Sequence, residues 1–222
     1  MIYNTNVRLR RPMSRNDRTC ACRVRIGALG LSLCFLASQN AVAFDYPLQE
    51  EQVREGYFLG RTTDGEKLAD FYKQYVHYFP FPARGPYYSY LESVEFRTPY
   101  ELVVLRSREK LNQYSALEAD EDYRAHPNQV VVRVMISFKL GYAGPIPPTN
   151  SFKVRVSQAD LIEPKQFNTE WLCHLWNDCG VTRFAILLWF DAEQFASGAA
   201  KIKIMTPDGQ ILKTEFDLDK LT

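Results

Sequence analysis

The sequence predicts an α+β fold in which an N-terminal helical hairpin packs on a mainly antiparallel β-sandwich. Three observations carry this prediction. Apolar residues recur at helical spacing between residues 48 and 79. They alternate with polar residues over most of the last 93 residues. Glycine- and proline-rich segments separate the alternating runs, as is typical of antiparallel sandwiches.

The first 43 residues have the order of a cleavable secretory signal. Seven arginines and one acid lie in residues 1–25, an apolar run covers Ile26–Ala37, and Ala41–Ala43 is a small-x-small cleavage site. The apolar run is about 12 residues long, whereas a membrane span needs roughly 20, so a retained anchor is the less favoured alternative. Leu33 before Cys34 argues against a lipoprotein signal. We therefore predict cleavage after Ala43, export to the periplasm or the outside of the cell, and no stable membrane span afterwards.

Removal of that signal would reverse the net charge. Residues 44–222 hold 20 Lys and Arg against 25 Asp and Glu, a net charge of −5, whereas the full chain carries +1. This balance argues against a nucleic-acid partner, because phosphate binding needs a basic surface. The remaining length suits one compact unit. We expect a signal over 1–43, a helical hairpin over 44–84 and a sandwich-like region over 85–222, the last two forming one unit.

The two cysteines that follow the signal are predicted to form a disulfide. Cys173 and Cys179 are an even pair in an oxidising compartment. Six helical steps rise about 9 Å, whereas bridged Cα atoms lie roughly 5.5 Å apart, so the segment must turn back. Asn177–Gly180 supplies turn residues. A metal site that uses Cys173, His174, Asp178 and Cys179 is a less favoured alternative, since no second ligand pair lies nearby. No metal and no cofactor are expected.

Two helices are expected before the strands begin. The first covers residues 48–59. The second begins at a Thr63–Glu66 capping box and continues to Phe79, because Pro80 ends it. Its aromatic stripe is interpreted as a face that packs on the following sheet. A third, short helix is expected over 115–125, with Ser115 and Glu118 as its capping box.

The rest of the chain is predicted to be mainly strands. The run 184–190 is apolar on both faces, which indicates a central strand that is covered on both sides. Pro207–Gly209 indicates a hairpin turn between two alternating runs. The expected strands cover residues 88–96, 102–105, 130–140, 152–157, 184–190, 201–205 and 211–216.

The sequence contains none of the familiar catalytic motifs. It lacks a Gly-x-Ser-x-Gly elbow, a His-Glu-x-x-His zinc motif, a phosphate-binding glycine loop and a dinucleotide fingerprint. The histidines favour structural interpretations: His77 on the aromatic helix, His126 at a helix end and His174 inside the cysteine loop. The 25 acids after the signal do not single out a catalytic carboxylate pair. An enzyme is therefore the less favoured class.

We interpret the chain as an exported, non-catalytic binding or interaction module of the cell envelope, with a protein or glycan partner. Trp171 and Trp176 are the candidate contact residues, because they flank the cysteine loop and a constrained loop can hold rings outward. Two alternatives stay open. A hydrolase that acts on an envelope glycan predicts two carboxylates facing each other across a cleft. A scaffold or assembly subunit predicts an exposed apolar patch on the helical hairpin.

Overall fold

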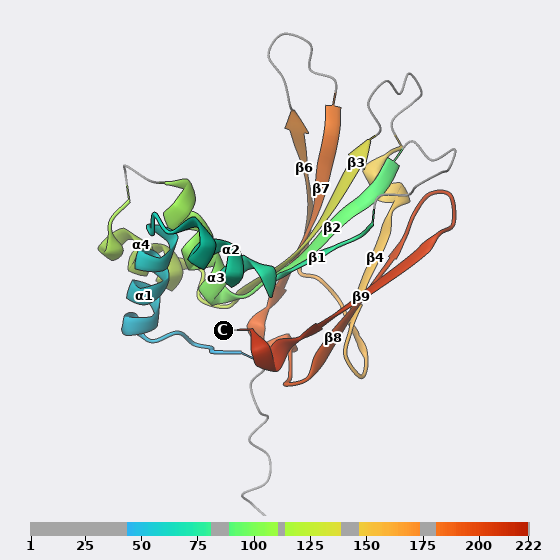
Figure 1. Ribbon diagram of the computed structural model, residues 1–222. Helices are drawn as coiled ribbons and strands as arrows, with labels where there is room; N and C mark the ends of the chain where they lie inside the picture. The colour runs from blue at the N-terminus through green and yellow to red at the C-terminus, as the bar shows by residue number, and fades with distance from the viewer. Residues whose placement is uncertain (1–43, 81–88, 111–113, 139–146, 174–180, 222) are drawn as a thin grey trace, which may run out of the picture. The chain divides into compact units, whose positions relative to one another are not determined.

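The computed structural model describes residues 44–80, 89–110, 114–138, 147–173 and 181–221, all within one compact unit, Asn40–Thr222 (Figure 1). These residues form an α+β fold with four α-helices and two antiparallel sheets of nine strands in all. None of the helices in these ranges is both long and apolar enough to cross a membrane. The helices are α1 (Glu50–Gly60), α2 (Gly65–Lys73), α3 (Pro99–Glu109) and α4 (Ala116–Ala125).

One sheet has five strands and the other has four. The five-stranded sheet has the order β1 (Val76–Tyr78), β2 (Ser89–Arg97), β3 (Gln129–Phe138), β7 (Val181–Asp191), β6 (Gln166–Cys173). The four-stranded sheet has the order β5 (Leu161–Ile162), β4 (Lys153–Ser157), β8 (Ala199–Met205), β9 (Ile211–Asp217). The edge strands are therefore β1 and β6 in the five-stranded sheet, and β5 and β9 in the four-stranded sheet.

Both sheets contribute side chains to one buried apolar cluster. In β3, β7 and β8, alternate residues enter it, as the twofold period of a strand requires. The ring of Phe96 in β2 lies 5.8 Å from that of Phe216 in β9, and the ring of Phe152 lies 5.5 Å from that of Phe184 in β7. The inner residues of β3, β7 and β8 have almost no exposed area.

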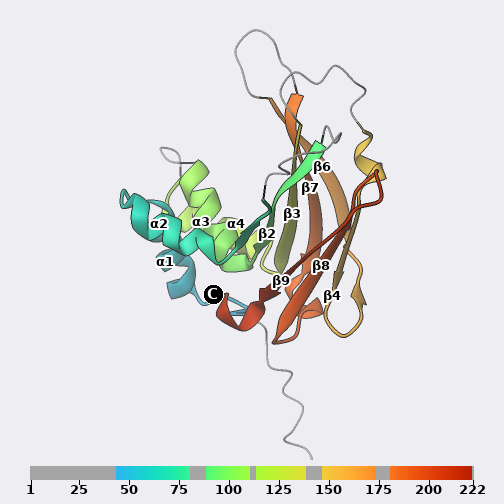
Figure 2. The same ribbon diagram turned by 45° about the vertical axis from the view of Figure 1, so that its right-hand side comes forward.

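The helices gather on one side of the strands (Figures 1 and 2). Helix α1 packs against α3 and α4, and α3 also contacts β2. The helices meet closely because Gly60 has no side chain: a Cβ there would lie 2.3 Å from the carbonyl oxygen of Val104. A second apolar cluster, which includes Val53, Val103 and Tyr123, fills the space between α1, α3 and α4.

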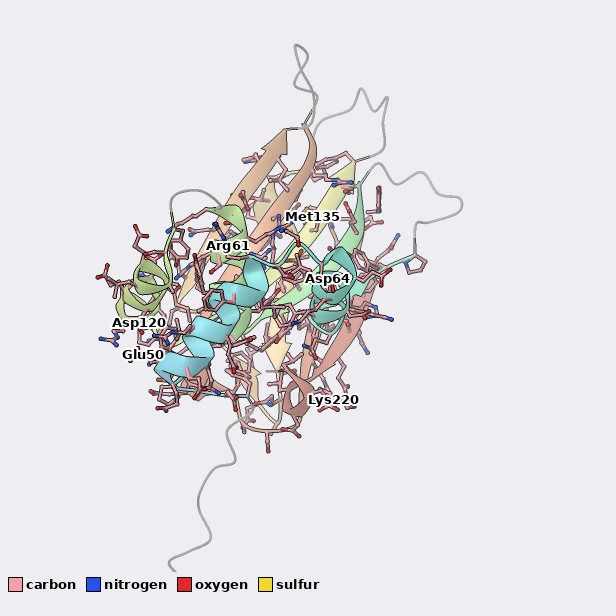
Figure 3. All side chains as sticks on the ribbon, turned by 60° about the vertical axis from the view of Figure 1, so that its left-hand side comes forward. Glu50, Arg61, Asp64, Asp120, Met135 and Lys220 are labelled. Atoms are coloured by element: carbon pink, nitrogen blue, oxygen red, sulfur yellow. The ribbon has the colours of Figure 1, made fainter. Side chains whose placement is uncertain are left out.

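One predicted helix is shorter than expected and one predicted strand is wrong, and local chemistry explains both. The second helix begins at Asp64 rather than Thr63, because the Asp64 carboxylate accepts the N–H groups of Glu66 and Lys67 (Figure 3). It ends at Lys73, and Val76–Tyr78 instead pairs with β2, which places His77 on a strand. The segment 102–105 is helical, because Thr98 caps α3 and Pro99 occupies its first turn.

Most of the remaining elements are confirmed. Strands β2, β3, β4, β7, β8 and β9 fall within or close to the predicted ranges, and β7 lies inside its sheet between β3 and β6. Ser115 and Glu118 form the predicted capping box of α4. The turn between β8 and β9 contains Gly209 with a φ of 85°, a conformation that favours glycine. Residues 139–140 of the third predicted strand lie outside the described residues.

Candidate functional site

The edge formed by β6 exposes aromatic side chains that belong to the inner face of its sheet. Phe167 and Trp171 lie four residues apart in β6 and therefore share a face. They pair with Leu188 and Phe184 of β7, both of which are buried in the core. Because no further strand pairs with β6 in the described part of the sheet, Phe167 stays 46% exposed and Trp171 49% exposed.

A hollow of about 360 Å³ opens beside this edge, where β6 and β7 face β4 and β5. Its lining combines apolar residues, among them Phe152, Phe167 and Leu188, with the charged residues Lys153, Arg155 and Glu163. The hollow exists because β5 has only two residues, Leu161 and Ile162, and is too short to cover the space along β6. Its volume lies in the range of small-molecule sites, so it can hold an aromatic or aliphatic group.

Trp171 is fixed in place by contacts with the core. Its ring lies 5.2 Å from the ring of Phe184, which in turn contacts Phe138 at 5.7 Å and Phe152 at 5.5 Å. A half-exposed ring that is held in this way loses little conformational freedom on binding. The structure places Trp171 in a strand rather than in a loop. The second predicted contact residue, Trp176, lies outside the described residues.

The cysteine loop lies at the end of the same pair of strands. Cys173 is the last residue of β6, and its backbone pairs with that of Val181 in β7. This antiparallel pairing places the two ends of the cysteine segment side by side. Cys179, His174 and Asp178 lie outside the described residues. Within the described residues, no group of three or more His, Cys, Asp and Glu side chains is arranged to hold a metal.

The structure also reveals a buried carboxylate that sequence analysis missed. Glu101 in α3 is 1% exposed, and its Oε2 atom has no hydrogen-bond partner among the described residues. Burial raises the pKa of Glu101 well above its usual value, although Arg97 opposes the rise. The nearby Tyr72 hydroxyl is also buried without a described partner, and its pKa is raised to about 12, first by burial and then by Glu101. The sequence does carry a signal for the position of Glu101: Thr98 and Glu101 have the spacing of a helix N-cap and its third residue.

Neither Glu101 nor a histidine forms an accessible reaction centre in the described residues. His77 on β1 packs against the ring of Phe79 at 4.8 Å, and His126 follows the last turn of α4. The hollow at the β6 edge has one acid, Glu163, and two other surface hollows have one each, Asp208 and Glu215. These three hollows do not supply the facing pair of carboxylates that a glycan hydrolase requires.

No protein-family model, no curated protein and no solved structure matches this chain.

Proposed function

We propose that this protein is an exported, non-catalytic interaction module of the cell envelope, and that its β6 edge binds an extended segment of a partner protein. The two sheets would then form a β-sandwich that presents this edge. Their shared core and the ring contacts between Phe96 and Phe216 and between Phe152 and Phe184 support that packing. The arginine-rich start and the apolar run of residues 1–43 support export.

The character of β6 carries the proposal. An edge strand presents backbone N–H and C=O groups that another chain can pair with, and proteins usually protect such edges by shortness or by charge. Strand β1 has three residues and β5 has two, while β9 carries Lys213, Glu215 and Asp217. Strand β6 has eight residues, carries a single charged residue, the exposed Glu170, contains no proline, and exposes two aromatic rings.

Strand addition and side-chain burial would act together at this edge. A partner segment that pairs with β6 would place alternate side chains over the hollow between β6 and β4. An aromatic or aliphatic side chain of that segment would contact Phe152, Phe167 and Leu188 there. Trp171, held against Phe184, would contact the partner farther along the strand.

A charge placed on this edge tests the proposal. We expect Phe167→Lys to reduce capture of the partner from solubilised native envelope by about tenfold or more, because aromatic contacts dominate such interfaces. Trp171→Ala should act in the same direction. Capture is measured by quantitative mass spectrometry of proteins retained on the immobilised protein, and amide exchange of β6 should slow in the complex.

Phe58→Lys is the matched control. Phe58 is an aromatic residue that is 61% exposed, more than Phe167, and it lies on α1, which packs against α3 and α4. Retention that responds to Phe58→Lys and not to Phe167→Lys would refute the β6 edge as the binding surface. Concentration-dependent self-association that is lost in Phe167→Lys would instead favour the assembly-subunit alternative, with β6 edges pairing between copies.

The proposed disulfide would close the end of the β6–β7 hairpin. Its support is the signal-like order of residues 1–43 and the backbone pairing of Cys173 with Val181, which follows Cys179 by two residues in the sequence. Mass spectrometry of the exported protein without reductant should show a product that begins at Phe44 and lacks two hydrogens. A product with two alkylatable thiols would contradict it.

A further inference from the structure

The outer face of the four-stranded sheet is strongly basic. Its cations are Lys153 and Arg155 on β4, Lys201 and Lys203 on β8, and Lys213 on β9, here called the basic face. They alternate with inward residues such as Val156, Ile202 and Ile204, which are buried in the core. The five cations therefore point away from the core.

Strand register brings three of these cations into one row. Lys203 pairs with Arg155 on one side and with Lys213 on the other. Neighbouring strands lie about 4.8 Å apart, so the row holds three positive charges at that repeat. Like charges directly opposite each other in a sheet are destabilising. The row therefore costs stability that a row of mixed charge would not.

The basic face is not neutralised by the protein itself. None of its five cations takes part in an ion pair with the described residues. Glu215 lies opposite Lys201 in the register, but the two are not paired within 4.0 Å. Because residues 44–222 carry a net charge of −5, this face reverses the sign of the surrounding chain. A surface whose charges are unpaired is available to an anionic partner.

The face is also hollowed. A depression of about 560 Å³ is lined by Ser157, Lys201, Lys203, Lys213 and Glu215, among others. A linear polymer fits such a depression better than a flat bilayer surface does. Ser157 and Glu215 add groups that can exchange hydrogen bonds with hydroxyls, whereas the three lysines supply charge. Arg155 extends the row of cations beyond the lining of this depression.

We propose that the basic face binds a linear acidic polysaccharide that carries one carboxylate or sulfate per sugar. The spacing of the row across β4, β8 and β9 is close to the length of one sugar unit, so successive acid groups would meet successive cations. The guanidinium of Arg155 can bind two oxygens of one acid group, and the lysines act as point charges. The row lies on a different sheet from β6, although Arg155 also lines the hollow beside the β6 edge, and the proposal does not depend on the function proposed there.

Polygalacturonate, a linear polymer with one carboxylate per sugar, is the probe. We expect the purified protein to bind it in isothermal titration calorimetry, more weakly as salt is raised, since binding releases counterions from the polymer. Fully methyl-esterified polygalacturonate, in which each carboxylate is neutral, should bind at least tenfold more weakly. Failure to bind the acidic polymer at low salt would overturn the proposal.

Matched variants locate the binding. The triple variant Arg155→Gln, Lys203→Gln, Lys213→Gln should weaken binding by about tenfold or more and reduce its salt dependence. The control Arg54→Gln, Lys67→Gln, Lys73→Gln removes one arginine and two lysines from exposed helical positions, and should change affinity less than twofold. Both variants change net charge equally, so an equal loss in both would overturn the basic face as the site.

A charge-preserving variant and a membrane control complete the test. Lys203→Arg with Lys213→Arg should keep binding, which separates loss of charge from misfolding. Vesicles of phosphatidylglycerol test a membrane surface as the occupant. Binding of those vesicles through Arg155, Lys203 and Lys213, without binding of polygalacturonate, would replace the polysaccharide by a membrane and overturn the proposal.

Discussion

The outer faces of the two sheets both carry charged residues, but these form ion pairs on one face and not on the other. On the five-stranded sheet, Glu95 accepts hydrogen bonds from Arg97 at 2.5 Å and from Arg133 at 2.9 Å. Glu92 accepts a hydrogen bond from Ser137 and pairs with Arg183 at 3.2 Å. The basic face of the four-stranded sheet has five cations and no ion pair among the described residues. Charges on the first face therefore pair with one another, although Nε of Arg133 is buried without a partner among the described residues, whereas those on the second are left for solvent or a partner.

The charged side chains of the five-stranded sheet are also less exposed to solvent than those of the basic face. Glu95, Arg97 and Arg133 keep only 14%, 18% and 16% of their side-chain area exposed. Partly buried charges of this kind need partners, because removal from water is costly. Four of the five cations of the basic face are exposed and remain hydrated. The comparison indicates that the first set of charges holds the fold together, and that the second set is dispensable for folding.

Removal of Glu95 should have the largest effect on stability. We expect Glu95→Ala to lower the free energy of unfolding by about 2–3 kcal/mol, because it leaves two partly buried arginines without their shared partner. Urea denaturation measures the change. Glu50→Ala is the control: Glu50 pairs with Arg54 at 3.6 Å on an exposed surface and should cost no more than about 0.5 kcal/mol. Equal effects of the two variants would break the comparison.

Glu101 gives a test that depends on pH. Its folded-state pKa is raised above the ordinary value of 4.5, chiefly by burial, so the folded state holds this proton more tightly than the unfolded state does. The resulting stability is complete below pH 4.5 and is lost as pH rises through the raised pKa. Glu101→Gln keeps the shape and removes the charge.

We therefore expect Glu101→Gln to match the parent protein near pH 4 and to be more stable at pH 8. Urea denaturation at several pH values measures the difference, with Glu109→Gln on the same helix as the control, because Glu109 is exposed. A variant that is less stable than the parent at pH 8 would show that the Glu101 carboxylate has a stabilising partner when ionised, contrary to its burial without one.

Periodicity in the sequence predicts the buried inner face of β3, but not the burial of Val131, Met135 and Ser137 on its other face. Val130, Val132, Val134 and Ile136 alternate, and the structure buries all four in β3. Periodicity failed at residues 102–105, because a run of four apolar residues fits a buried helix as well as a strand. There the capping residues Thr98 and Pro99 decide the outcome, and their signal was available.

Position within a sheet was not predictable from the sequence. The sequence pattern of residues 166–173 does not predict a strand. The segment lies at an edge because β7 is its only neighbour in the described sheet, and a local pattern carries no information about such pairing. The sequence points to Trp171 through its position beside the cysteine loop, and gives no signal for Phe167, which shares a face with Trp171 only once β6 is known. The row of Arg155, Lys203 and Lys213 likewise depends on the register of three strands.

The smallest expected effect concerns the centre of that row. Lys203→Gln should raise the free energy of unfolding by about 0.5 kcal/mol at low salt, because it removes repulsion from both Arg155 and Lys213. The gain should vanish at 1 M salt, where charges are screened over about 3 Å. Lys73→Gln on α2, with no cation opposite it in a sheet, should show neither effect. Loss of stability in Lys203→Gln at every salt concentration would mean that this lysine supports the fold.

A gain at low salt alone would show that the chain retains a repulsive row at a cost in stability, which is expected when the charges serve binding.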